Sequence, residues 1–342
     1  MIQQFLTWYN GLTDSLWGSL LLFAVGVVLL IKGGDWFVDA SVGVAKRFHV
    51  PEIIIGATVV SIGTTLPEVM VSVTAALNDN AAVAYGNAIG SIICNTSLIA
   101  ALTIAIRPAP VERKTLVTPV LFFFASAAIY VVAAYAFGRF DRWLGIVMLA
   151  VFAIYMTMTI RKGFQNPTES HEEEASDTKS GSLVKDLLVL VLSAALIAVG
   201  ADMLEGSSVS LSLMAGIPTE VVGVTVVALC TSLPELVTAV TALVKGHGAL
   251  SLGNIIGANI FNLVLVSGTA VTLSPFVVPE GSKLLGYNAS QLIEIPVMIG
   301  VMALMTLPAL KKGKLGRWQG VSLLCIYAAF VTLQVLIALG VF

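Results

Sequence analysis

The sequence predicts an all-α integral membrane protein of about ten transmembrane helices, arranged as two inverted five-helix repeats with broken central helices. Of its 342 residues, 57% are hydrophobic and only 11% are charged, and polar residues divide the chain into about ten apolar segments. Soluble proteins average roughly a quarter charged residues, whereas a helix that crosses a membrane needs about 20 mostly apolar ones. The strand-type alternation of a membrane β-barrel is absent.

The Lys and Arg residues between the apolar segments predict the orientation of the chain. Of the 18 Lys and Arg residues, fourteen lie in loops after odd-numbered spans and three lie in loops after even-numbered spans. Because short cytoplasmic loops collect Lys and Arg, we expect a multi-pass protein of the cell membrane with both termini outside the cytoplasm. The expected spans are 15–33, 52–77, 82–106, 115–137, 142–161, 184–212, 219–244, 249–274, 289–309 and 318–341.

The two halves of the chain resemble each other at a fixed offset of 167 residues. GATVVSIGTTLPEVMVSVTAAL (56–77) aligns with GVTVVALCTSLPELVTAVTALV (223–244), and GNAIGSIICN (86–95) aligns with GNIIGANIFN (253–262). Five spans per half is an odd number, so the second copy enters the membrane from the opposite side, as in many secondary transporters. The expected units are a first transmembrane repeat (1–162), an acidic cytoplasmic linker (163–183) and a second, inverted repeat (184–342).

Each repeat places a proline and a glutamate inside an apolar run. Ionised carboxylates at membrane depth are destabilising by about 3 kcal/mol or more unless they are paired, yet no Lys or Arg lies near Glu68 or Glu235 in either predicted helix. A bound cation is the simplest partner for them. Pro67 and Pro234 are expected to break the two helices at corresponding depths and to free backbone carbonyl groups.

Hydroxyl and amide side chains lie close to both glutamates along the chain. Such oxygens, together with carboxylates and without Cys or His, favour Ca²⁺ and Na⁺ over Zn²⁺ or Cu²⁺. A lone Ser or Thr in a membrane helix more often bonds to a backbone carbonyl, and a lone Asn can join two helices, but duplication of the whole set favours an ion site. The candidate ligands are Glu68, Glu235, Thr64, Thr65, Thr231, Ser232, Ser91, Asn95 and Asn262.

The paired motifs GTTLPE (63–68) and CTSLPE (230–235), with GNAIGSIICN and GNIIGANIFN, resemble the signatures of the cation/Ca²⁺ antiporter superfamily, in particular the sodium/calcium exchangers. The resemblance covers nearly the whole chain. It implies that spans 2, 3, 7 and 8 pack around four ion sites and that spans 1 and 6 slide past them. It also implies that the glutamates bind Ca²⁺ directly and share Na⁺, with backbone carbonyls of Ser61 and Ala228 completing the sites.

Three positions depart from the pattern of that family. Cys230 replaces the glycine that begins the motif, which is expected to alter local flexibility. Ala258 lacks the hydroxyl of the matching Ser91, so one Na⁺ site on the second repeat is expected to be weakened or lost. Asn262 stands where potassium-dependent relatives, and some prokaryotic exchangers, have Asp, which argues against K⁺ cotransport. The number of Na⁺ ions exchanged stays open.

The function expected from the resemblance is secondary active exchange of Na⁺ for Ca²⁺ by alternating access, with Ca²⁺ extrusion as its purpose. A proton/Ca²⁺ antiporter of the same superfamily is the alternative, although no His lies near either glutamate. A cation channel and an intramembrane enzyme are less favoured, because broken inverted repeats suit alternating access and no HExxH motif is present. We expect no enzyme activity, no cofactor and no nucleic-acid partner, only the two ions and the lipid bilayer; the oligomeric state stays open.

Overall fold

The computed structural model describes residues 15–165, 183–216, 228–279 and 287–339, together with Gly11, Thr13, 283–284 and Val341. Most of these residues are helical, and nine of the described helices are long and apolar enough to cross a membrane. The protein is therefore an all-α membrane protein, as its composition predicts. The first part of the expected span 219–244 and most of the expected linker lie outside the described residues.

Helices of the first half follow the predicted spans, with π-helical turns (η) inside several of them. Their bounds are α2 (Leu16–Phe48), α3 (Glu52–Ile55), η1 (Gly56–Val60), α4 (Ser61–Leu77), α5 (Ala81–Cys94), η2 (Asn95–Ala100), α6 (Ala101–Ile106), α7 (Arg113–Val132), η3 (Ala133–Phe137) and α8 (Arg142–Gln165).

The second half repeats this order of elements. Its helices are α9 (Leu183–Met214), α11 (Ala228–Thr231), α12 (Leu233–Val244), α13 (Gly248–Phe261), η5 (Asn262–Val266), α14 (Ser267–Leu273), η6 (Ser290–Glu294), α15 (Ile295–Lys312) and α16 (Arg317–Ala338).

Short strands join loops of the two halves. β1 (Ala109–Pro110) pairs with β6 (Lys314–Leu315), and β2 (Arg139–Phe140) pairs with β3 (Phe276–Val277), both antiparallel. A further hairpin pairs β4 (Lys283–Leu284) with β5 (Tyr287–Asn288). β1 and β6 follow odd-numbered spans of the predicted topology, whereas β2 and β3 follow even-numbered ones. Each pair therefore joins loops expected on the same face of the membrane, as two inverted five-span repeats require.

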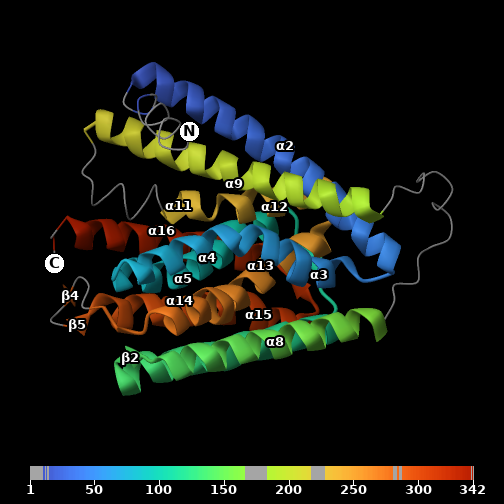
Figure 1. Cartoon of the computed structure of the whole chain (residues 1–342). Coiled ribbons are helices and arrows are strands. Elements are labelled where there is room, and N and C mark those ends of the chain that lie inside the picture. Colours follow the sequence, from blue (N-terminus) through green and yellow to red (C-terminus); the bar gives the residue numbers. More distant parts are fainter. Residues whose placement is uncertain are drawn as a thin grey trace.

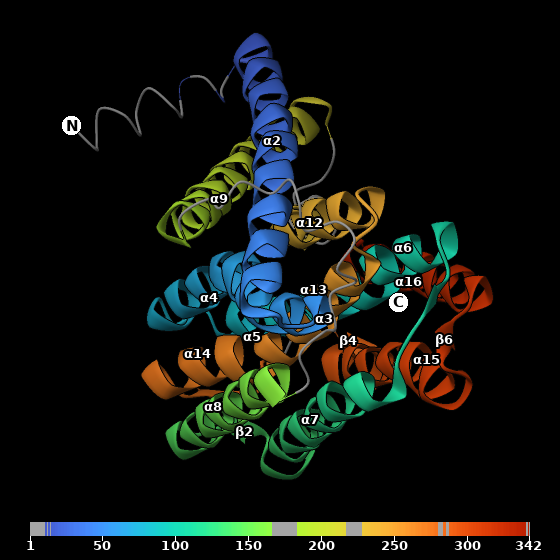
Figure 2. The same ribbon diagram turned by 90° about the vertical axis from the view of Figure 1, so that its right-hand side faces the viewer.

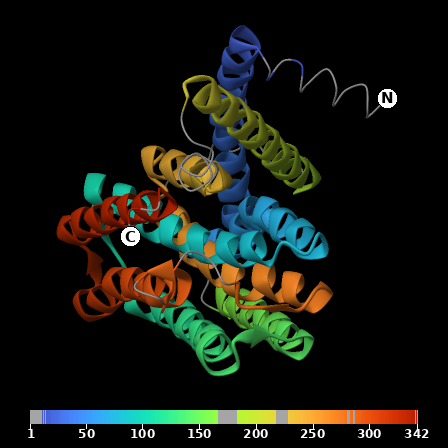
Figure 3. The ribbon, with the colours of Figure 1, turned by 90° about the vertical axis from the view of Figure 1, so that its left-hand side faces the viewer.

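The helices α2 and α9 form a long pair along one side of the molecule (Figures 1 and 2). Their backbones touch where Gly26 meets Gly200, since a Cβ added to Gly26 would lie 2.9 Å from the carbonyl oxygen of Gly200. On the opposite side of the molecule lie α7, α8, α14 and α15 (Figures 2 and 3). The centre is formed by α4, α5, α12 and α13, which correspond to spans 2, 3, 7 and 8.

Two predicted features differ in the structure. The first span was expected to end at residue 33, but α2 continues to Phe48. The aspartates that interrupt the apolar run pair with Lys245, the residue that follows α12: its Nζ lies 3.5 Å from Asp35 Oδ1 and 2.8 Å from Asp39 Oδ1. Pro67 does not break its helix, since α4 runs through it. In the second repeat the interruption lies at Ser232, between α11 and α12.

Candidate ion-binding site

The two glutamates come from the two repeats and lie together in the centre of the protein. Glu68, on α4, and Glu235, in the first turn of α12, are both 0% exposed. Their carboxyl groups are close enough to interact electrostatically. Neither oxygen of Glu68 has a hydrogen-bond partner, and Glu235 Oε1 accepts only a long bond of 3.5 Å, from Thr65 Oγ1. Two acidic groups are thus buried side by side with almost no hydrogen bonds to stabilise them.

No cationic side chain balances these carboxyl groups among the described residues. The ion pairs found there involve Arg47, Arg139, Lys245 and His247, and none of them reaches either glutamate. Within the same ranges no three His, Cys, Asp or Glu side chains converge to hold a metal ion. A cation between the two glutamates would therefore be held by two carboxylates and neutral oxygens, the ligands of hard ions.

The predicted hydroxyl groups come from both repeats. Thr64 Oγ1 donates to Asn254 Oδ1 at 3.2 Å, and Ser61 Oγ lies within hydrogen-bonding distance of two carbonyl oxygens, those of Gly56 (2.8 Å) and Asn254 (2.9 Å). Ser232 Oγ is buried without a partner at the interruption before α12. The backbones of Ala228 and Thr231 belong to α11, but their side chains lie outside the described residues.

Three further predicted side chains are buried in the helices that come after the two glutamate helices along the chain. Ser91 Oγ and all side-chain polar atoms of Asn95 and Asn262 lack a hydrogen-bond partner. A π-helical turn begins at each asparagine, η2 at Asn95 and η5 at Asn262, and such turns are frequent at functional sites. The turn η2 packs against α12, which holds Glu235, while η5 packs against α4, which holds Glu68. Each amide thus lies on a helix that contacts the glutamate helix of the other repeat.

Four polar residues of this region were not predicted. Asn254 and Asn87 occupy matching positions of the two GN motifs, so the internal repeat contained the signal for both. Thr238, one turn after Glu235, and Asn259, one residue after Ala258, have no polar counterpart in the first repeat and gave no such signal. All four are buried or half-buried, and Thr238 Oγ1 and Asn259 Oδ1 have no hydrogen-bond partner.

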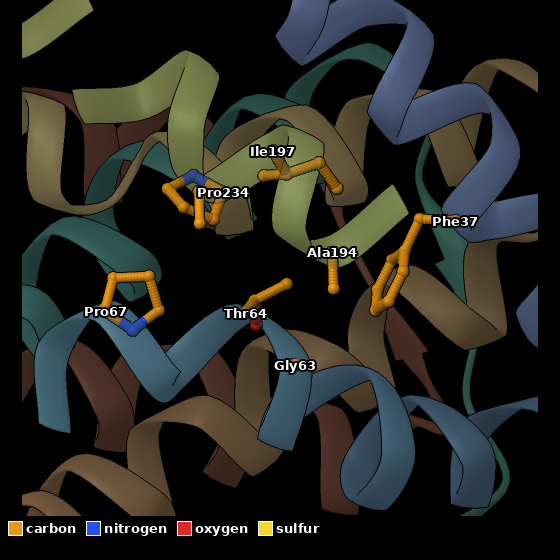
Figure 4. Close-up of a pocket in the computed structure, with 8 residues that line it drawn as sticks. Phe37, Gly63, Thr64, Pro67, Ala194, Ile197 and Pro234 are labelled. Carbon is orange, nitrogen blue, oxygen red and sulfur yellow. The ribbon is translucent and has the colours of Figure 1, made fainter. Parts of the chain in front are cut away.

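A small pocket separates the central helices from the α2–α9 pair (Figure 4). The two motif prolines lie on its inner side, together with Gly63 and Thr64, and apolar side chains of α2 and α9 close the other side. Phe37 of α2 packs so closely that a Cβ on Gly63 would lie 2.9 Å from its ring. The contact between the α2–α9 pair and the central helices is therefore apolar near Thr64.

Comparisons with known proteins identify the family of the chain. A family model described as "Sodium/calcium exchanger protein" matches residues 18–161 and 185–336. The chain belongs to the sodium/calcium exchanger family. Members of this family are membrane transporters that exchange ions, so this family member is a transporter rather than an enzyme.

Alignments with several relatives cover nearly the whole length of this chain. The Sodium/calcium exchanger MaX1 of Methanosarcina acetivorans is 32% identical, over 92% of this chain and 97% of its own. An uncharacterized membrane protein of Methanocaldococcus jannaschii is 34% identical, over 89% and 94%. The solved structure of the sodium-calcium exchanger NCX_Mj, soaked with 2.5 mM Na⁺ and 0.1 mM Ca²⁺, matches with a TM-score of 0.76 at 30% identity, over 92% and 97%. The match to NCX_Mj therefore supports the same fold over 92% of this chain.

Proposed function

We propose that this protein exchanges Na⁺ for Ca²⁺ by alternating access, at a site centred on Glu68 and Glu235. The observation that supports this most strongly is the burial of these two carboxyl groups side by side, one from each repeat, without a cationic side chain among the described residues. One Ca²⁺ neutralises two carboxylates. Several Na⁺ ions distributed over the same oxygens do so equally well, and a shared site couples the two ions because they exclude each other.

The neutral oxygens complete the proposed coordination. The hydroxyl and amide groups near the glutamates are buried, and several have no hydrogen-bond partner that would compete with an ion. In a buried setting such groups are destabilising unless something binds them. The proposed ligands besides the two glutamates are Thr64, Thr65, Thr231, Ser232, Ser91, Asn95 and Asn262, with backbone carbonyls of Ser61 and Ala228.

The proposed direction follows from the ion gradients. An inward Na⁺ gradient across the cell membrane would drive Ca²⁺ out of the cell. The name of MaX1 and the Na⁺- and Ca²⁺-soaked structure of NCX_Mj support the choice of these two ions. The asparagine at 262 argues against a requirement for K⁺.

Tracer uptake into liposomes tests this proposal. Liposomes that contain the protein and internal Na⁺ are diluted into Na⁺-free medium with tracer Ca²⁺, at clamped voltage, beside K⁺-loaded vesicles and vesicles with a pH gradient. We expect uptake only with internal Na⁺. If three Na⁺ leave for each Ca²⁺, one net positive charge moves outward, so an interior-positive voltage accelerates uptake; two Na⁺ per Ca²⁺ gives no voltage dependence.

Other outcomes would overturn the assignment. Uptake driven by the pH gradient alone would make the protein a proton/Ca²⁺ antiporter. Ca²⁺ flux that needs no counter-ion on the opposite side would make it a channel.

A further inference from the structure

The asparagines of the two GN motifs have different contacts although their positions match in the repeat. Asn87 is half-buried and stays within its own repeat: its Nδ2 donates to the carbonyl oxygen of Glu68 at 3.2 Å and to Ser72 Oγ at 2.8 Å. Asn254 is fully buried and reaches the other repeat. Its Oδ1 accepts from Thr64 Oγ1 at 3.2 Å. Only Asn254 therefore touches a side chain of the proposed ion site.

Close backbone contact holds Asn254 at this place. A Cβ on Gly253 would lie 2.2 Å from the carbonyl oxygen of Ile53, and a Cβ on Gly56 would lie 2.4 Å from that of Leu250. Helix α13 thus packs directly on the backbone of α3 and η1, just before Thr64. Since neither α13 nor the backbone of α3 and η1 has room to shift, the side-chain amide of Asn254 is kept within hydrogen-bonding distance of Thr64.

The contact gives the Thr64 hydroxyl hydrogen an acceptor outside its own helix. Hydroxyl groups in these helices commonly donate to the carbonyl four residues earlier, as Ser41 does to Phe37 (2.7 Å) and Thr58 does to Ile54 (2.7 Å). Thr64 instead donates across to Asn254. A hydroxyl has one hydrogen and two acceptor lone pairs, so a Thr64 whose hydrogen is bound to Asn254 offers its lone pairs to a cation.

We propose that Asn254 is a positioning residue for ion binding, which aims the oxygen of Thr64 at the transported ion without binding the ion itself. This inference rests on the proposed function, because it assumes that Thr64 is a ligand. Without the amide oxygen of Asn254, the Thr64 hydroxyl turns to a carbonyl of its own helix. The ion then loses a ligand although no ligand residue has changed.

A double-mutant cycle on the full-length protein tests this role. The variants are Thr64→Val, Asn254→Leu and their combination, and the measurement is equilibrium binding of tracer Ca²⁺ to purified protein, with KM and maximal rate of Na⁺-dependent uptake beside it. We expect each single variant to weaken Ca²⁺ binding about ten- to hundredfold, as for the loss of one hydrogen bond to a charged group. We expect the double variant to bind like Thr64→Val alone.

Asn87→Leu is the matched control, because Asn87 occupies the same motif position but does not touch Thr64. Its effect is expected to be the same in the wild-type and Thr64→Val backgrounds. Asn254→Asp keeps an acceptor oxygen toward Thr64, so in that variant Thr64→Val should still weaken binding. If Asn254→Leu does not fold, Asn254→Ser takes its place in the cycle, since serine is too short to reach Thr64.

The result that would overturn the positioning role is an additive cycle, in which loss of Asn254 weakens binding equally with and without the Thr64 hydroxyl, or an Asn254 variant with unchanged affinity. Failure of the proposed function looks different. In that case the wild-type protein itself neither binds tracer Ca²⁺ nor takes it up in exchange for Na⁺. A wild type that does both, with an additive cycle, leaves the exchange function in place and removes only the role of Asn254.

Discussion

Replacing Glu235 by glutamine removes one charge from the centre of the proposed site and almost no volume. In the ion-free protein two buried carboxyl groups lie together without a cationic side chain. Such a pair is destabilising unless protons or ions neutralise it. We therefore expect Glu235→Gln to leave the thermal stability of the ion-free protein unchanged or to raise it, which is unusual for a substitution at a fully buried polar position.

The same substitution is expected to weaken Ca²⁺ binding strongly, although it does not destabilise the ion-free protein. Removing one partner of a buried charge pair is destabilising by about 3–5 kcal/mol, which corresponds to a loss of Ca²⁺ affinity of about two to four orders of magnitude. In the wild type, Ca²⁺ at about 100 times its Kd stabilises the folded state by about 2.7 kcal/mol. At the same concentration the variant gains almost none of this.

Thermal unfolding of purified protein with and without Ca²⁺ measures both effects, and Na⁺-dependent tracer uptake accompanies it. Glu294→Gln is the matched control, because Glu294 is also a glutamate within an apolar span but both of its oxygens accept hydrogen bonds, from Ser290 (2.6 Å) and Gln334 (2.9 Å). It should retain the Ca²⁺-dependent rise in Tm. A Glu235→Gln variant with a normal Ca²⁺-dependent rise would refute the assignment of Glu235 as a ligand.

Three other substitutions test separate features. Gly253→Ala places a Cβ 2.2 Å from a backbone oxygen and is expected to destabilise the protein by about 1–3 kcal/mol in thermal unfolding. Gly300→Ala, in open space on α15, should be neutral or stabilising. Equal effects of the two substitutions would contradict the close packing at Gly253. Lys245→Met removes the ion pairs that tie α2 to the end of α12. It should shift the apparent Na⁺ affinity at most about fivefold, because partly exposed ion pairs contribute about 1 kcal/mol or less. Arg139→Met, in a local surface pair, should leave the affinity unchanged. Ala258→Ser restores the hydroxyl of the matching position and should raise the Hill coefficient for Na⁺ in uptake titrations, and an unchanged coefficient would place Ala258 outside any Na⁺ site.

Much of the architecture was predictable because it depends on local properties of the chain. Apolar length predicts the spans, and the offset of 167 residues predicts that the two halves share one fold. The same repeat identified Glu68 and Glu235 as an equivalent pair, since a carboxylate without a nearby basic residue stands out in any apolar segment. The comparisons confirm the fold and the family, while the ligand roles and the division into two repeats and a linker stay predictions.

Helix ends and breaks were less predictable, because partners distant in sequence decide them. The charged residues after position 33 suggested the end of a span, but pairing with Lys245 lets α2 continue to Phe48. Proline in the middle of a helix suggested a break at Pro67, yet neighbouring helices hold α4 in a continuous helix there.

The sequence by itself determined the membrane class, the duplicated architecture and the pair of buried glutamates, because these follow from hydropathy and from repetition along the chain. Only the tertiary structure decided how the two equivalent halves differ. Asn87 and Asn254 have the same motif position, but close packing of α13 on the first repeat brings Asn254 alone to Thr64, 190 residues away in the chain. A repeat makes two segments chemically alike, whereas packing in one conformation makes their contacts unequal.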